Sequence, residues 1–278
     1  MIAAITIHFR KPELTARCID SLLADSWAPV LVWDNSADGG VSCEALRTRY
    51  AEDARVLLIP NAHNLGFGAG MNAALVELGR RGYQGQVLLL NNDAWVRPGM
   101  QMAMRKALSD TAAPTLLAPR ILQDGGEQGW LHYQPWLALV TRQPVLGSFA
   151  YLSGCCLLVQ RADNALPLFD ESLFMYGEDV ELSWRFRRQG GRLVLMKRAW
   201  VEHEGSASSG QASEAYERFL VRSHWLLANR LAPNATLMWF MRALRVFTLV
   251  MRACLRSLRY RSTVPLQALA EMCRSCRN

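Results

Sequence analysis

The chain of 278 residues is 51% hydrophobic and 20% charged, a composition typical of folded globular proteins, which excludes a disordered chain, a collagen-like repeat and a coiled coil. Its seven cysteines are too few for a disulfide scaffold, and their odd number leaves at least one thiol unpaired, so we expect a reducing compartment. The net charge of +7 is carried by residues 242–278, which hold eight arginines and one acid, so the basic character belongs to a tail.

Strands and helices are predicted to alternate through the first third of the chain. Apolar runs predict strands at 2–9, 30–33, 55–59 and 86–90, and amphipathic segments predict helices from Pro12 to Leu22, at 43–50 and at 71–78. This alternation predicts a mostly parallel sheet with helices on both faces. The chain begins directly with a strand-like run and lacks the layout of a signal peptide, which favours a cytoplasmic protein.

Polar residues follow two of the predicted strands, at the edge of the sheet where ligands bind in α/β folds. Asp34 follows the second strand, and the run Asn91-Asn92-Asp93 follows the fourth. An isolated aspartate at a strand end is also common as a turn or helix cap, so both interpretations stay open at each position.

A glycine-rich segment, Asn64 to Gly70, precedes the third predicted helix. Its spacing is G-x-G-x-G, whereas the dinucleotide fingerprint requires G-x-G-x-x-G, preferably at the turn after the first strand. That turn, residues 8–12, contains no glycine, so a nicotinamide-dependent enzyme is excluded. The glycines are expected to let the backbone pass close to a bound nucleotide or turn tightly into the helix.

The second half of the chain is less regular. Residues 149–160 predict one long strand with Gly154 at a point of close backbone approach, and this uncharged stretch is too interrupted to cross a bilayer. A helix is predicted from Glu178 to Gln189, followed by strands at 193–196 and 200–202 that lead to His203. The adjacent carboxylates of Glu178 and Asp179 have a structural explanation as well, because acids at a helix start complement its dipole.

The carboxyl-terminal segment predicts a basic amphipathic helix. At 100° per residue, apolar side chains cover most of its circumference and arginines form one stripe, namely Arg242, Arg245, Arg252, Arg256 and Arg259. Such a helix suits the surface of an anionic membrane. The alternative is a terminal helix packed on its own domain with a solvated basic edge. Nucleic acid is not an expected partner, because no recognition motif accompanies the basic residues.

In order and spacing, these motifs resemble the family 2 inverting glycosyltransferases with the GT-A fold, particularly the rhamnosyltransferase-like branch. The resemblance spans about residues 3–210, in the stretches 5–23, VWDNSADGG at 32–40, NLGFGAGMNAAL at 64–75, LLLNNDAWVRPG at 88–99, SGCCLLVQR at 153–161, and 169–208. It implies a Rossmann-like α/β domain with a mixed, mostly parallel sheet over residues 1–210, and carboxyl-terminal helices over residues 211–278.

The resemblance also implies roles for the matching residues. Asp179 would be the general base, Asp93 would bind a divalent cation (Mg²⁺ or Mn²⁺), and His203 would be a second metal ligand or else a hydrogen-bonded structural residue. Asp34 would accept a hydrogen bond from the donor base, and the implied substrate-binding residues are Asp34, Asn64, Gly66, Asn72, Asn92, Gly154 and Glu178. Because the metal motif offers one carboxylate where many relatives carry two, Asn91, Asn92 or donor phosphates would complete the shell.

The expected reaction is inverting transfer of a sugar from a nucleotide donor to a saccharide acceptor of a cell-surface polysaccharide or lipopolysaccharide. The resemblance favours dTDP-L-rhamnose as donor, with UDP-sugars second, and a saccharide or lipid-linked saccharide as acceptor. With the basic tail, this implies a cytoplasmic protein peripheral to the inner face of the cell membrane. The alternatives are a sugar nucleotidyltransferase and a non-catalytic, membrane-associated sugar-nucleotide-binding protein.

Overall fold

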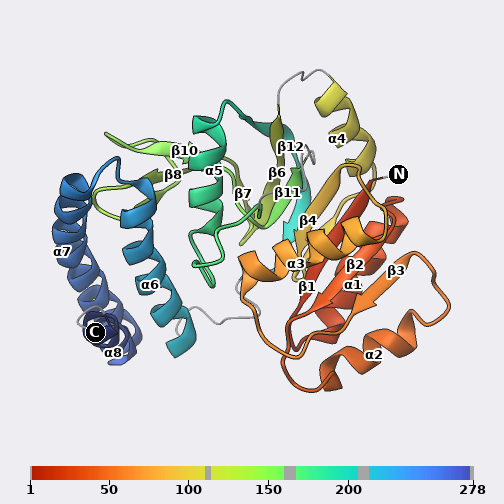
Figure 1. Ribbon diagram of the computed structural model, residues 1–278, viewed down its shortest axis with the longest axis horizontal. Helices are drawn as coiled ribbons and strands as arrows, with labels where there is room; N and C mark the ends of the chain where they lie inside the picture. The colour runs from red at the N-terminus through yellow and green to blue at the C-terminus, as the bar shows by residue number, and fades with distance from the viewer. Residues whose placement is uncertain (1, 110–113, 160–166, 206–212, 276–278) are drawn as a thin grey trace.

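The computed structural model describes residues 2–109, 114–159, 167–205 and 213–275. Within these ranges nine strands form one sheet, with β7 paired to β6 and the others in the order β3-β2-β1-β4-β11-β6-β12-β5 (Figure 1). The strands are β1 (Ala3–His8), β2 (Val30–Asp34), β3 (Val56–Ile59), β4 (Val87–Asn91), β5 (Ala94–Val96), β6 (Thr115–Gln123), β7 (Gly126–Gln128), β11 (Cys156–Val159) and β12 (Arg192–His203). Strands β3, β2, β1 and β4 are parallel and β11 is antiparallel to β4, which confirms the predicted mixed sheet.

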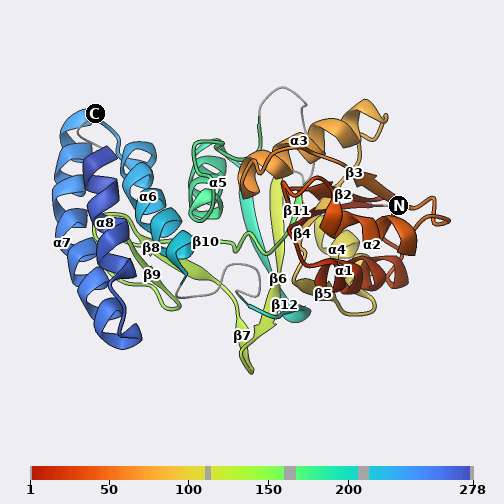
Figure 2. The same ribbon diagram turned by 90° about the horizontal axis from the view of Figure 1, so that it is seen from below.

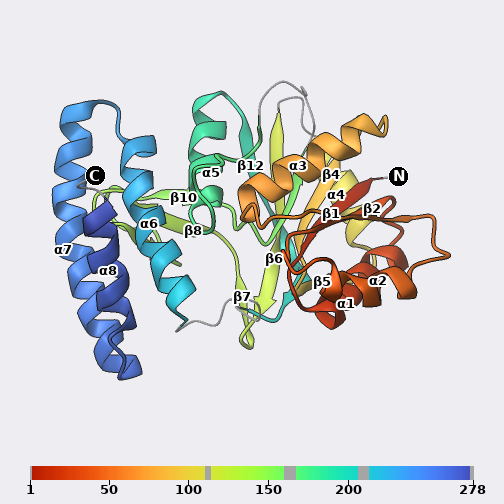
Figure 3. The same cartoon turned by 60° about the horizontal axis from the view of Figure 1, so that its bottom comes forward.

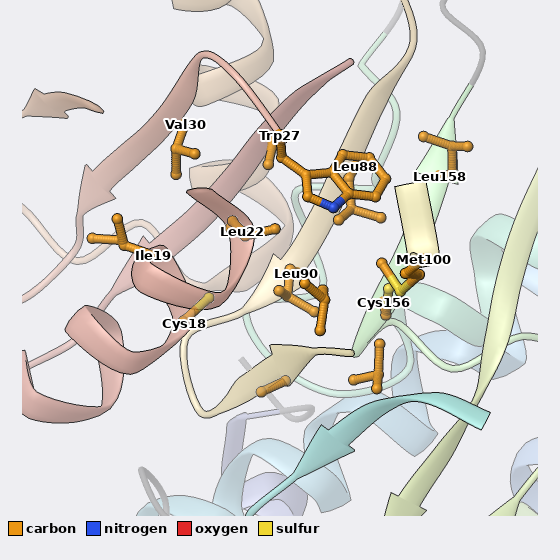
Figure 4. Packing of buried hydrophobic residues seen from close by; sticks show 14 of the residues in the cluster. Cys18, Ile19, Leu22, Trp27, Val30, Leu88, Leu90, Met100, Cys156 and Leu158 are labelled. Atoms are coloured by element: carbon orange, nitrogen blue, oxygen red, sulfur yellow. The ribbon is translucent and has the colours of Figure 1, made fainter. Parts of the chain in front are cut away.

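Helices cover both faces of this sheet, because its central strands are buried on both sides. One face packs against α1 (Pro12–Ala24), α2 (Val41–Arg49) and α4 (Met100–Ser109), and the other against α3 (Phe67–Arg80) and α5 (Glu178–Arg188). Figure 4 shows Trp27 beside Leu88 of β4, and Met100 beside Cys156 of β11. Each such fully buried apolar side chain contributes about 1.5–3 kcal/mol to folding.

The predicted strand at 149–160 is wrong as a single element. It consists of β10 (Phe149–Tyr151) and β11, separated by residues 152–155, and residue 160 lies outside the described ranges. Strand β10 leaves the main sheet and pairs with β8 (Leu131–Gln134), which in turn pairs with β9 (Leu139–Thr141) in a separate small sheet. Ser153 and Gly154 interrupt the apolar pattern at the break, and Gly154 marks the end of the pairing rather than a close approach within one strand.

Two further boundaries differ from the prediction. The helix predicted at 71–78 already begins at Phe67, since Gly66 ends the preceding turn. The strands predicted at 193–196 and 200–202 form one strand, β12, whose pairing with β6 shifts register between Leu195 and Val201. The irregularity carries two exposed basic residues, which interrupt the apolar alternation and make one strand resemble two.

Three carboxyl-terminal helices lie at the end of the molecule away from β1–β4 (Figures 1 and 2). They are α6 (Glu214–Leu231), α7 (Ala235–Tyr260) and α8 (Val264–Ser275). Helix α6 shares a hydrophobic core with the small sheet and with Val180 of α5. The domain boundary predicted between residues 210 and 211 lies outside the described residues. None of the helices in the described ranges has the length and hydropathy of a membrane span.

Helix α7 turns most of its arginine stripe inward and leaves Arg259 exposed, which corrects the expectation that the whole stripe is free to meet a membrane. Arg245 is fully buried and donates hydrogen bonds to the carbonyl oxygens of Pro135 and His224. Arg256 forms an ion pair with the buried carboxylate of Glu217 on α6. Periodicity alone defines the two faces of a helix but not which of them points inward. Here the acceptors of Arg245 and Arg256 fix the basic face inward.

Candidate active site

The carboxyl ends of β1 and β2 form the first part of the site. Asp34 ends β2 opposite His8 and is 2% exposed, and its Oδ1 accepts a hydrogen bond from the backbone N–H of Ser36. The turn-capping interpretation of Asp34 therefore holds, while its contact with a donor base stays a prediction. Burial lowers the pKa of His8, whose ring nitrogens lie within hydrogen-bond distance of the hydroxyls of Thr15 and Ser42.

The glycine-rich segment is fastened to both β2 and the 169–174 segment. Asn35, which sequence reasoning missed, donates from Nδ2 to the carbonyl of Gly66 and accepts at Oδ1 from the N–H of Leu65. Gly66 has a φ of 81°, and a Cβ there would lie 2.2 Å from the carbonyl oxygen of Phe174. A tight turn into α3 thus requires this glycine, and Asn64 caps the turn by accepting from its N–H.

Asn72 on α3 is engaged in holding the segment that leads to α5. Its Nδ2 donates to the carbonyl of Phe169 and to the carboxylate of Glu171, and its Oδ1 accepts from the N–H of Phe169. Asn72 is 5% exposed. These bonds give Asn72 a structural role, and its contact with a substrate stays a prediction.

Asp93 and His203 are brought together although 110 positions separate them. Asp93 lies in the turn between β4 and β5, and its Oδ1 is 3.1 Å from Nε2 of His203 at the end of β12. The other ring nitrogen, Nδ1, donates to Oε1 of Gln123, whose own Nε2 donates to Asp124. When the ring is neutral, the lone pair of Nε2 faces Oδ1 of Asp93. Both atoms are then hydrogen-bond acceptors, and this contact is favourable only with a cation or a proton between them.

The two asparagines of the metal motif differ in their environment. Asn92 is 7% exposed and donates from Nδ2 to the hydroxyl of Thr15 on α1. Asn91 has a buried Oδ1 that lacks a hydrogen-bond partner within the described residues. A buried acceptor of this kind needs an explanation, and a bound ion is one. The described residues hold no cluster of three or more histidine, cysteine or acidic side chains, so Asp93 and His203 are a pair.

Asp179 is held at the start of α5 by two backbone donors. Its Oδ2 accepts from the N–H of Gly154 at 3.0 Å, and its Oδ1 accepts from the N–H of Val180 at 2.8 Å. A Cβ at position 154 would lie 3.3 Å from that of Asp179, so the close approach predicted for Gly154 is present. Burial raises the pKa of Asp179, and these two N–H donors oppose the shift by stabilising the carboxylate.

Glu178 lies beside Asp179 in a different environment. It is 8% exposed, and its Oε2 is buried without a hydrogen-bond partner among the described residues. Burial, together with the neighbouring charge of Asp179, raises the pKa of Glu178. Of the two adjacent carboxyls, Asp179 receives two backbone hydrogen bonds that favour its ionised form, whereas Glu178 has a buried oxygen that receives none within the described residues.

Both carboxyls line a cavity of about 170 Å³ whose other walls sequence reasoning missed. The small sheet contributes Tyr133 and Tyr151, and α6 contributes His224, whose Nδ1 is 3.2 Å from the Tyr133 hydroxyl. Burial and the charges of Arg252 and Arg245 lower the pKa of His224 to about 3, so this ring is neutral. Its Nδ1 can therefore accept from Tyr133, and the described lining residues of the cavity include no lysine or arginine.

One segment joins Asp179 to the run Asn91-Asn92-Asp93. In the 152–155 break, the N–H of Gly154 donates to Asp179 and the carbonyl of Cys155 accepts from the N–H of Asn91. In Figure 2 the chain runs from β10 to β11 just below α5. The structure thus groups Gly154, Glu178 and Asp179 on one side and Asn91, Asp93 and His203 on the other, with the break between them.

The raised pKa of Glu178 predicts how stability depends on pH. Between its ordinary pKa near 4.5 and the raised folded-state value, the unfolded chain releases this proton while the folded protein retains it, so stability falls as pH rises through that window. We expect Glu178→Gln, which mimics the protonated acid, to be more stable than the parent by at least about 1 kcal/mol at pH 8. Urea unfolding should show this difference vanishing near pH 4, and a pH-independent difference would contradict it.

No family model matches the chain. It is 29% identical over 276 residues to N-acetylglucosaminyl-diphospho-decaprenol L-rhamnosyltransferase of Mycobacterium tuberculosis, a match that covers 86% of the chain and 89% of the relative. Among solved structures it is similar to GalNAc-T7 crystallised with UDP, GalNAc and Mn²⁺, with a TM-score of 0.61 and 13% identity over 94% of the chain, and it spans 58% of that protein.

Two more structures share the fold. Mannosyltransferase PcManGT from Pyrobaculum calidifontis, in complex with GDP-Man and Mn²⁺, matches all of the chain with a TM-score of 0.57 and 14% identity, over 80% of its own length. TarS 1–349 of S. aureus matches 99% of the chain with a TM-score of 0.54 and 14% identity, over 91% of its own length. Together with the motifs and the fold, these likenesses confirm the predicted resemblance to the rhamnosyltransferase-like branch, and the chain is a glycosyltransferase with the GT-A fold.

Proposed function

We propose that this glycosyltransferase moves L-rhamnose from dTDP-L-rhamnose, with inversion, to the N-acetylglucosamine of a lipid-linked diphosphate acceptor at a membrane surface. The observation that carries the proposal is the placement of Asp179 in a cavity, held by the N–H of Gly154, while the next residue, Cys155, accepts from the N–H of Asn91 in the run that leads to the Asp93–His203 pair. The donor follows from the sequence resemblance, with UDP-sugars as second candidates. The acceptor follows from the name of the mycobacterial relative.

Asp179 is suited to act as the general base. In an inverting transfer the acceptor hydroxyl attacks the anomeric carbon from the face opposite the leaving nucleoside diphosphate, and its proton passes to a positioned carboxylate. The amide bonds from Gly154 and Val180, with the amino terminus of α5, favour the ionised form of Asp179 and fix its orientation. Glu178 keeps its proton more readily, so it can donate a hydrogen bond to the acceptor rather than take a proton.

The Asp93–His203 pair fits one half of a divalent-metal site. Its N···O separation of 3.1 Å matches two neighbouring ligands of an octahedral ion at about 2.1 Å, a geometry in which carboxylate, imidazole and substrate phosphates share the shell. The unpartnered Oδ1 of Asn91 lies in the same motif. A bound Mg²⁺ or Mn²⁺ would supply Lewis-acid stabilisation of the departing diphosphate. Gln123 would keep the His203 Nε2 lone pair directed at the site.

Helix α7 supports a membrane location through its outward face. This apolar face consists of Trp239, Phe240, Leu244, Val246, Phe247, Val250, Met251, Leu255 and Leu258, each at least 40% exposed. In all three views α7 lies at the far end of the molecule, with its outer side uncovered (Figure 3). Because most of the arginine stripe is turned inward, insertion of the apolar face, and not a basic stripe, would bind the protein to the membrane. Arg259 and Arg261 stay exposed at the carboxyl end of the helix.

The assignment of the base predicts unequal effects within the carboxylate pair. We expect Asp179→Asn to reduce rhamnosyl transfer from dTDP-L-rhamnose by about 10²–10⁴-fold, because the attacking hydroxyl loses its proton acceptor. Binding of dTDP should be retained, and Glu178→Gln should keep most of the rate. If Asp179→Asn turned over almost normally while Glu178→Gln did not, the assignment within the pair would be reversed. Transfer from UDP-hexoses but not from dTDP-L-rhamnose would overturn the donor.

The metal assignment predicts metal-dependent nucleotide binding. At a hundredfold excess over its dissociation constant, dTDP with Mn²⁺ should stabilise the protein by about 2.7 kcal/mol, a rise in Tm of a few degrees for a chain of this size. Asp93→Asn and His203→Ala should lose the part of this shift that EDTA removes. Glu52→Gln, on the exposed turn after α2, is the matched control. An equal shift in EDTA and in Mn²⁺ would contradict a metal at Asp93.

The membrane assignment predicts that the apolar face of α7 drives partitioning. We expect the triple substitution Phe240→Ser, Phe247→Ser and Leu258→Ser to weaken binding to anionic vesicles at least 100-fold, since each buried side chain contributes about 1.5–3 kcal/mol. Deletion of residues 236–278 should abolish binding. The control is Met102→Ser, which removes an equally exposed apolar side chain from α4.

Two outcomes would reject this location for α7. Vesicle binding unchanged by the triple substitution would show that the apolar face is not inserted. A parent dimer that the triple substitution converts to a monomer, in sedimentation without lipid, would assign the face to a second copy of the chain.

A further inference from the structure

The cavity beside Asp179 lies between α5, α6 and the small sheet, and its lining is buried in one part and open in another (Figures 1 and 3). The buried lining residues include the aromatic side chains of Tyr133 and Tyr151. The lining residues that stay at least partly exposed are Val140, Tyr176, Gly177, Asp179 and Leu220. Tyr176 is thus the tyrosine of the described lining that an entering molecule can contact, as it can contact the carboxylate of Asp179.

The backbone of Tyr176 is left-handed. Its φ is 69°, and Gly177 follows with a φ of 83°. A bulky residue is rarely found in this region, because its Cβ crowds a neighbouring carbonyl oxygen. Such a conformation persists where the surrounding structure holds it, and it is concentrated at active sites and ligand clamps. The backbone of Tyr176 is therefore a second observation, independent of the cavity, that points to a functional side chain at this position.

Two aromatic contacts with α6 hold the segment 174–176 in place. The ring of Phe174 stacks on that of Phe219, with centroids 4.7 Å apart. The rings of Tyr176 and Tyr216 meet edge to face, with centroids 5.1 Å apart. An edge-to-face pair leaves at least one face of the Tyr176 ring uncovered by its neighbour. The ring is thus fixed by α6 and can still present a face to a ligand.

The size and chemistry of the cavity fit one neutral sugar ring. Its volume of about 170 Å³ equals that of about six water molecules at about 30 Å³ each, which is the size of one monosaccharide. The described lining residues include no lysine or arginine that could pair with a diphosphate. A pyranose has an apolar face of C–H groups and a rim of hydroxyls, and an aromatic ring beside a few polar groups matches both.

We propose that Tyr176 is an acceptor-binding residue whose ring stacks on the apolar face of the acceptor sugar and so directs one sugar hydroxyl to Asp179. The proposal rests on the proposed function, in which Asp179 takes the proton of that hydroxyl. Tyr176 and Asp179 are three positions apart, on either side of the point where α5 begins. Because the ring is fixed against α6, it sets which hydroxyl faces the carboxylate, and Tyr176 thereby determines the affinity for the acceptor.

Steady-state kinetics with two variants at position 176 test this role. Tyr176→Gly removes the ring but accommodates the left-handed backbone, so this variant should fold. We expect it to raise KM for the acceptor N-acetylglucosaminyl diphospho-farnesol about 10- to 100-fold, the contribution of one buried aromatic side chain. KM for dTDP-L-rhamnose should not change. Tyr176→Phe keeps the ring and should restore most of the acceptor affinity that Tyr176→Gly loses.

The matched control is Ser26→Gly. Ser26 is exposed after α1 and also has a left-handed backbone, with a φ of 65°, so a glycine there relieves the same conformation away from the cavity and should change neither KM. An acceptor KM that Tyr176→Gly leaves unchanged would overturn the proposal. So would a KM that rises for the donor as much as for the acceptor, and so would a Tyr176→Phe variant as weak as Tyr176→Gly.

Saturation-transfer NMR separates this proposal from the proposed function, because it needs neither donor nor turnover. The probes are the methyl glycosides of N-acetylglucosamine, glucose and galactose. We expect saturation to pass to the ring protons of at least one glycoside in the parent and in Tyr176→Phe, and not in Tyr176→Gly. This result without rhamnosyl transfer would reject the proposed function alone. A glycoside signal that is equal in all three proteins, or absent from all three, would overturn the proposal for Tyr176.

Discussion

The hydrogen bond from the N–H of Gly154 to Asp179 is the contact around which the site is organised. To make it, the chain must leave the main sheet between β10 and β11, and the same break directs the carbonyl of Cys155 to the N–H of Asn91. Asp179, the proposed base, and the run Asn91 to Asp93, the proposed metal motif, are therefore positioned by one short segment. Any side chain at 154 would push against Asp179, whose Cβ is only 3.3 Å from the position of an added methyl.

The carboxyl-terminal helices are part of this arrangement and not a separate appendage. A Cβ at Gly177, which precedes α5, would lie 2.3 Å from the hydroxyl oxygen of Ser223 on α6, so the backbone beside the carboxylate pair packs directly on that helix. Helix α6 in turn is joined to α7 through Arg245 and the carbonyl of His224. Two close packing contacts thus connect the surface of α7 to the cavity at α5. A membrane bound to α7, as proposed, would fix the orientation of that cavity.

Local sequence patterns predicted the parts of the site that local structure determines. Strand ends place Asp34 and Asp93 and a helix start places Asp179, and the strands β2 and β4 are buried runs typical of a sheet covered on both faces. What depends on distant partners was missed. The break at 152–155 is held by hydrogen bonds to α5, and the wall of the cavity beside Asp179 joins Tyr133 to His224, 91 positions apart. A sequence pattern within a window of twenty residues cannot reveal contacts between residues this far apart.

The orientation of α7 shows how a buried charge can decide what a helix exposes. Arginines are normally placed outward because water solvates them, and burying one is unfavourable unless it is paired and fully hydrogen-bonded. Here the turn at Pro135 and the carbonyl of His224 bond Arg245, and the buried carboxylate of Glu217 pairs Arg256. With Arg245 and Arg256 bonded inside, rotation of α7 would leave these acceptors unpaired, so the apolar face is held outward by polar contacts on the opposite side. The exposed apolar face of α7 is thus a consequence of the polar contacts on its buried side, and it is the surface that the proposed membrane location would use.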